Sequence, residues 1–81
     1  MGKKYNFILT KHCELRLDQR CLSLENVKNV VRYSKEVKVL NRGKHGGLLK
    51  KFRKSADDKT LVVVAEIRNK TCWLATAFYE S

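Results

Sequence analysis

The sequence contains no proline and few glycines, so it offers no obvious place for a linker. Its 81 residues include four glycines and no low-complexity stretch or internal repeat. A chain of this length has room for one hydrophobic core. We therefore expect residues 1–81 to form one domain, with any functional site on its surface or in a shallow cleft.

Cysteine is also scarce, and the cysteines are too few to pair completely. The three are Cys13, Cys21 and Cys72. Met1 to Lys4 lack the apolar run of a secretory signal. The longest apolar run, Leu61 to Ala65, is far shorter than a membrane span requires. These features predict a cytoplasmic, reduced protein with no membrane partner, whose cysteines lie in the core.

The motifs that hold metals or nucleotides are missing. Cys13 and Cys21 would lie about 12 Å apart along a helix axis, and there is no C-x-x-C or H-x-x-x-H pair. Gly43, Gly46 and Gly47 precede a predicted strand instead of opening a helix, so they do not form a phosphate-binding loop. We expect no metal ion and no small-molecule cofactor.

Acidic residues are few relative to basic ones. Eighteen Lys and Arg stand against eight Asp and Glu, which gives a formal net charge of +10. The chain is 43% hydrophobic, enough to fold and not remain a basic tail. Such a surplus commonly attracts phosphates or an acidic protein. RNA or an acidic protein is therefore the expected partner, and a charge that only keeps the chain soluble is the alternative.

The order of apolar and polar residues predicts an α+β fold. Two helices, capped by Thr10 and Ser23, follow a first strand, and Leu22 is placed to pack on Val27 beside the second cap. The predicted order is β-α-α-β-β-β-β, with both helices on one face of a mainly antiparallel sheet. The strands are expected at 5–9, 36–42, 48–54, 60–67 and 72–79, with a turn at 56–59.

The predicted strands also divide residues between two sheet faces. We favour a register with Leu48 and Phe52 in the core, which exposes a positive open face. Along the last strand, simple alternation places Trp73 and Tyr79 on the face opposite Phe78, with Trp73 in the core. The candidate nucleic-acid-binding residues are Lys11, Lys38, Arg42, Lys50, Lys51, Lys54 and Arg68.

A row of polar side chains follows one side of the first predicted helix. His12, Arg16 and Arg20 fall in one sector of the helical wheel, together with Gln19. This row suits a phosphate backbone. An equally good interpretation is that the two arginines pair with acids such as Glu66, which interrupts an apolar strand and needs a cation. Arg16, Arg20 and Arg53 are the candidate cations.

These residue types also fit metal-free RNA cleavage. That reaction needs a base for the 2′-hydroxyl proton, an acid for the leaving oxygen, and cations around the phosphate. His12 would take one role and Glu66, Tyr79 or His45 the other, although a loop histidine between Lys44 and Gly46 is more typically solvated. Arg16, Arg20 and Arg53 would supply the cations.

The run from Thr10 to Arg20 and the following 22–31 segment resemble a small, widespread bacterial domain with a T-x-H-x-x-x-R-x-x-x-R helix signature. The order of elements is similar to the RelE/ParE/BrnT toxin superfamily. That resemblance implies a small basic domain that pairs with an antitoxin, and in many members cuts messenger RNA without metal. It also implies a sheet face as the active surface. Lys51, Arg53, Arg68 and Tyr79 correspond in kind, whereas a His-Arg row on the first helix departs from the superfamily's usual pattern.

The sequence thus predicts a RelE-like, toxin-like RNA-binding protein, with metal-independent endoribonuclease activity as the candidate reaction. Two alternatives stay open: a non-catalytic module for nucleic acid or an acidic antitoxin-like protein, and a toxin directed at a protein target. The candidate catalytic residues are His12, Arg16, Arg20, Arg53, Glu66 and Tyr79.

Overall fold

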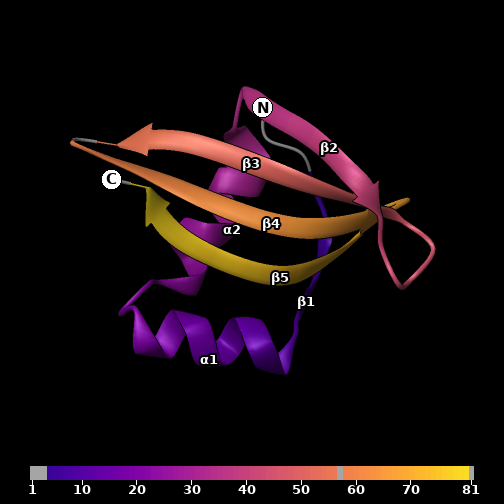
Figure 1. Ribbon diagram of the computed structural model, residues 1–81, viewed down its shortest axis with the longest axis horizontal. Helices are drawn as coiled ribbons and strands as arrows, with labels where there is room; N and C mark the ends of the chain where they lie inside the picture. The colour runs from indigo at the N-terminus through magenta and orange to yellow at the C-terminus, as the bar shows by residue number, and fades with distance from the viewer. Residues whose placement is uncertain (1–3, 57, 81) are drawn as a thin grey trace.

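The computed structural model describes residues 4–56 and 58–80 and shows two helices against a five-stranded sheet (Figure 1). The α+β class and the predicted order β-α-α-β-β-β-β are confirmed. The elements are β1 (Asn6–Leu9), α1 (Lys11–Gln19), α2 (Leu24–Tyr33), β2 (Glu36–Arg42), β3 (Leu48–Ala56), β4 (Lys59–Arg68) and β5 (Thr71–Glu80).

The sheet is mainly antiparallel, as expected from its short connections. Its strand order is β1-β5-β4-β3-β2, and only β1 runs parallel to its neighbour, β5, among the described strands. Both β3 and β4 extend into the predicted turn at 56–59, and Asp57 lies outside the described residues. In this strand order, β1 and β2 are the two edges of the sheet.

Side-chain caps begin both helices where the sequence predicted them. The Thr10 hydroxyl accepts a hydrogen bond from the Cys13 amide at 3.1 Å, and the Ser23 hydroxyl accepts one from the Asn26 amide at 3.5 Å. Each cap satisfies an N–H that the first helical turn leaves free. Thr10 also donates to the Leu74 carbonyl at 2.7 Å, which ties the start of α1 to β5.

Both helices contribute to one core on one side of the sheet. α1 packs against β5, and α2 packs against β3 and β4 (Figure 1). This arrangement leaves the opposite side, the open face, without a helix among the described residues. The buried core residues are Cys13, Leu17, Leu22, Val27, Val30, Val31, Phe52, Leu61, Val63, Ala65, Cys72, Leu74 and Ala77.

The core confirms part of the expected burial and corrects the rest. Phe52 is buried as predicted, whereas Leu48, on the same side of β3, is 43% exposed because it opens the strand at the sheet's corner. Cys13 and Cys72 are buried, and burial raises the pKa of the Cys72 thiol to about 12, with a further contribution from Cys13. Cys21 is exposed, contrary to the prediction. No helix in the described ranges is long and apolar enough to cross a membrane.

A bulge in β5 overturns the predicted faces of the aromatic residues. The pairing with β4 skips Ala75, so strict alternation is interrupted there. Trp73 pairs with Glu66 and lies with Phe78 on the open face, while Tyr79 lies on the other side. Trp73 is half-buried on the open face and does not belong to the core.

Candidate functional site

Glu66 lies on β4, and the loop between β2 and β3 encloses its buried carboxylate. Its side chain is 5% exposed. One carboxylate oxygen accepts hydrogen bonds from the backbone amides of His45 and Gly47, both at 2.8 Å. The other lies 3.0 Å from His45 Nδ1. The predicted pairing of Glu66 with an arginine is therefore wrong, because the loop between β2 and β3 satisfies the carboxylate instead.

Glycines allow this loop to close around the carboxylate. A Cβ on Gly43 would lie 2.1 Å from the Glu66 carboxyl carbon, and one on Gly47 would lie 2.5 Å from a backbone carbonyl oxygen. Gly46 has φ +80°, a conformation that other residues rarely adopt. These positions therefore need glycine for close packing around Glu66, and not only for the flexibility of a hairpin tip.

The environment of Glu66 favours its ionised form. Burial alone would raise the pKa of this carboxyl, but the hydrogen bonds from Gly47 and His45 outweigh it and lower the pKa below its ordinary value of 4.5. An ionised carboxylate only accepts hydrogen bonds, so the proton in this contact sits on His45 Nδ1. In the neutral form of the imidazole, Nε2 is then the ring nitrogen with a free lone pair.

A second contact fixes the plane of the His45 ring. The ring stacks on Trp73 with centroids 4.4 Å apart and planes 4° from parallel. Glu66 thus holds one edge of the imidazole, Trp73 covers one face, and the His45 side chain remains 33% exposed. A loop histidine that the sequence suggested to be solvated is held in one orientation and stays accessible.

His12 and His45 line the same cleft, which has a volume of about 580 Å³. His12 comes from the first turn of α1, and His45 comes from the loop across the sheet. Lys11, Arg42 and Lys44 line the same space. The cleft therefore brings two imidazoles and three cations together. A wider hollow of about 760 Å³ beside α1 contains no histidine and two acidic side chains, so it suits a phosphate less well.

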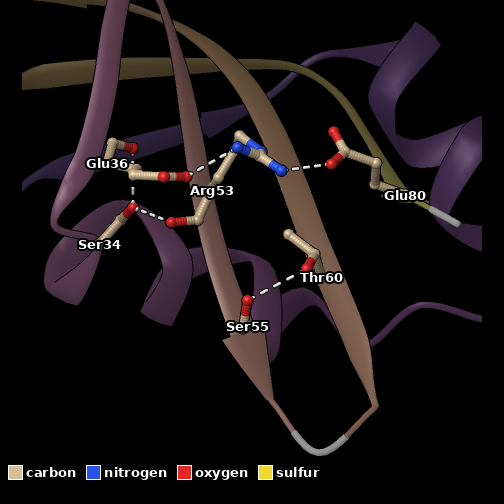
Figure 2. Close-up of polar contacts among 6 residues, drawn as sticks. All are labelled: Ser34, Glu36, Arg53, Ser55, Thr60 and Glu80. Atoms are coloured by element: carbon tan, nitrogen blue, oxygen red, sulfur yellow. Dashed lines mark hydrogen bonds and ion pairs between the residues drawn. The ribbon is translucent and has the colours of Figure 1, made fainter.

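Arg53, a predicted catalytic cation, lies away from this cleft in an ionic cluster (Figure 2). Its Nη1 donates to Glu36 Oε2 at 2.9 Å, its Nη2 donates to Glu80, and its carbonyl accepts from the Ser34 hydroxyl. These contacts join β2, β3 and β5. We refer to Arg53, Glu36 and Glu80 as the arginine clamp.

The remaining predicted catalytic residues do not line the cleft either. Arg20 donates to the Ala77 carbonyl of β5 at 2.8 Å, past the residues 71–74 that pair with β1. Arg16 donates to Gln19 on the same helix at 3.2 Å. Tyr79 lies under the Lys59 ammonium, 5.1 Å from its ring centroid. The predicted row on α1 is thus divided: His12 reaches the cleft, whereas Arg20 anchors the helix to the strand.

The predicted nucleic-acid-binding residues fall into three groups. Lys11 and Arg42 line the cleft. Lys38 and Lys51 are direct partners across β2 and β3 on the open face, and like charges so placed repel each other. The others have different positions: Lys50 on the helix side of β3, Lys54 over the Tyr33 ring, and Arg68 donating to the His45 carbonyl at 3.3 Å.

Comparisons with protein-family models, with curated proteins and with solved structures gave no match. The residues themselves therefore carry the functional argument.

The sequence reasoning named His45 only as one of three possible partners of His12 and as more typically solvated, and it placed Trp73 in the core. A usable signal was present: Glu66 is the single acid in an apolar strand, and His45 lies among glycines that allow close backbone approach. Trp73 was hidden by the bulge at Ala75, which alternation does not reveal. Lys44 joins the cleft as a neighbour of His45.

Proposed function

We propose that this protein binds RNA on the open face of its sheet and cleaves it in the cleft without a metal ion. The observation that carries the proposal is the presence of two imidazoles in one basic cleft, one of them oriented by a buried carboxylate. The toxin of a toxin–antitoxin pair, acting in the cytoplasm, is the biological setting that the sequence resemblance implies.

The proposed reaction uses both histidines. His45 Nε2 removes the proton from a ribose 2′-hydroxyl, whose oxygen attacks the adjacent phosphorus. The bond from phosphorus to the 5′-oxygen breaks, and protonated His12 gives its proton to that leaving oxygen. The products are a 2′,3′-cyclic phosphate and a 5′-hydroxyl. Lys11, Arg42 and Lys44 would stabilise the charge that develops on the phosphate.

Binding outside the cleft is proposed to use the open face. Lys38 and Lys51 repel each other there, so a phosphate between them would relieve an unfavourable contact. Arg16 continues the side of α1 that begins with His12, and so extends the basic surface beyond the cleft.

The proposal is tested by incubating the protein with mixed RNA in EDTA and following cleavage and binding together. We expect cyclic phosphate ends, with cleavage lost and binding retained in His12→Ala and in His45→Ala. Lys11→Ala should weaken binding, and Lys59→Ala, which removes the same charge at the other end of the sheet, should not.

Three results would contradict the proposal in different ways. Cleavage abolished by EDTA would exclude the metal-free reaction. Salt-sensitive binding without cleavage would favour a non-catalytic nucleic-acid module. Absence of both binding and cleavage would favour a toxin directed at a protein.

A further inference from the structure

The edge strand β2 has an unusually open environment. It is the last strand in the sheet order, and all seven of its residues are exposed. An edge strand of this length presents unpaired backbone N–H and C=O groups that can pair with an added strand. The opposite edge, β1, has four residues, two of them half-buried against the core. β2 is therefore the edge better suited to an additional strand.

The two sides of β2 have different chemistry. The register places Val37 and Val39 on the helix side and Lys38 on the open side. Because α2 packs against β3 and β4, the two valines extend past the helix and are 44% and 53% exposed. Lys38 pairs directly with Lys51 of β3, and the next residue across the sheet, Val64 of β4, is apolar, so no acid stands in this row. From Val37 to Val39 the edge is thus apolar on the helix side and cationic on the open side, where the neighbouring acid, Glu36, is already paired with Arg53.

We propose that β2 binds an extended acidic segment of another protein as a sixth strand of the sheet. Side chains of an added strand alternate between the two faces. Carboxylates on the open side would lie beside Lys38 and relieve its repulsion with Lys51. Apolar side chains on the helix side would cover Val37 and Val39. The fitting segment therefore alternates acidic and apolar residues, and this inference does not depend on the proposed RNA cleavage.

Charge disfavours a second copy of the chain as the occupant. Each copy carries a net charge of +10, and pairing two β2 strands would bring Lys35, Lys38 and Arg42 of both copies together. The acid on this strand, Glu36, is already bound by Arg53. An acidic partner supplies the charge that β2 lacks.

The test uses two short synthetic peptides of identical composition. One alternates Glu and Val, and the other has its Glu and Val residues in two blocks. Calorimetry would measure their affinities, and amide chemical shifts of the labelled protein would locate them. Val39→Glu adds a repelling charge at an exposed position of β2, and Ile8→Glu adds the same charge at an exposed position of β1.

We expect the alternating peptide to bind more tightly than the block peptide, with the largest shifts in β2. Val39→Glu should weaken binding at least about tenfold, and Ile8→Glu should leave it within about twofold because it lies at the far edge. Equal affinity for the two peptides, or an equal loss in both variants, would show only general attraction to a basic surface and would overturn the proposal. Self-association of the chain through β2, seen by sedimentation, would also overturn it by making a second copy the occupant.

Discussion

The two ends of the open face each contain an acid–base contact, and the two contacts serve different purposes. At the cleft end, one buried carboxylate is satisfied by two backbone amides and His45, and the imidazole remains accessible. At the other end, one guanidinium is held between Glu36 and Glu80, and Val62 beneath it is completely buried. The first arrangement presents a reactive group, and the second closes the sheet surface.

The comparison shows that a suitable side chain can serve in catalysis only if its reactive group is not already bound by other residues. Arginine is a good ligand for phosphate, but Arg53 already has two carboxylates, so a phosphate would have to displace them. Histidine in a glycine-rich loop has no fixed position of its own, but Glu66 and Trp73 give His45 one. The cleft end is therefore the part of the face suited to catalysis.

The largest effect is expected from removal of the accessible imidazole. His45→Ala should lower the rate of RNA cleavage about 10²- to 10⁴-fold, because it removes the proposed general base. RNA affinity should change little, since Lys11, Arg42 and Lys44 remain. Single-turnover cleavage in EDTA measures the rate, and filter binding measures the affinity. Cleavage at the wild-type rate would assign the chemistry to other residues.

A smaller loss is expected from Glu66→Gln, which tests whether the carboxylate orients His45. A Gln oxygen can still accept from the His45 and Gly47 amides, but its NH₂ group would face His45 Nδ1 and favour the tautomer with the proton on Nε2. Cleavage should fall about 100-fold, with the ¹⁵N shifts of the imidazole reporting the exchanged tautomer. Loss of cleavage without a change of tautomer would assign Glu66 a merely structural role.

The packing of the loop can be tested separately with Gly43→Ala. The added methyl group would overlap the Glu66 carboxyl group, so the loop or the carboxylate must shift. We expect the free energy of unfolding to fall by about 1–3 kcal/mol, measured by urea denaturation. Gly46→Ala introduces strain at a positive φ without such a steric overlap and serves as the comparison. An unchanged stability in Gly43→Ala would contradict the close approach.

The sequence predicted the framework well because local chemistry determines it. Thr10 and Ser23 mark helix starts through their own hydroxyl groups, and the alternation in 36–42 and the short turns indicate antiparallel strands. It also indicated that Glu66 needed a partner. All of these features depend on neighbours in the sequence.

The site was predicted only in part because it depends on contacts between distant segments. His12 and Glu66 were identified as candidates. The partner of Glu66, His45, comes from a loop twenty-one residues away. The sequence favoured an arginine as that partner because an arginine is always charged. A single bulged residue, Ala75, moved Trp73 to the open face. Arg53 could not be assigned because its partners lie on β2 and β5, which only the folded sheet brings together.

At the other end of the open face, the arginine clamp can be tested with Arg53→Met. Arg53→Met keeps an apolar stem over Val62 and removes the guanidinium, including its unpartnered buried Nε. Because Glu36 is largely exposed, we expect the free energy of unfolding to fall by no more than about 1 kcal/mol. Cleavage per folded molecule should be unchanged. A large loss of cleavage with normal stability would return Arg53 to the catalytic set.

The smallest effect is expected on stability at low pH. Acid should weaken the cleft end of the open face, because Glu66 loses its charge there. The pKa of Glu66 is lower in the folded protein than its ordinary value of 4.5, so the unfolded chain binds the proton more readily. Its stabilising contribution is therefore complete above about pH 4.5 and is lost as the pH falls through the depressed pKa. The difference in stability between the wild type and Glu66→Gln should shrink over that range, measured by urea denaturation at successive pH values, with Lys59→Ala as a variant whose difference stays constant. A difference that persists undiminished into strong acid would mean that the carboxylate's charge contributes nothing to holding the loop.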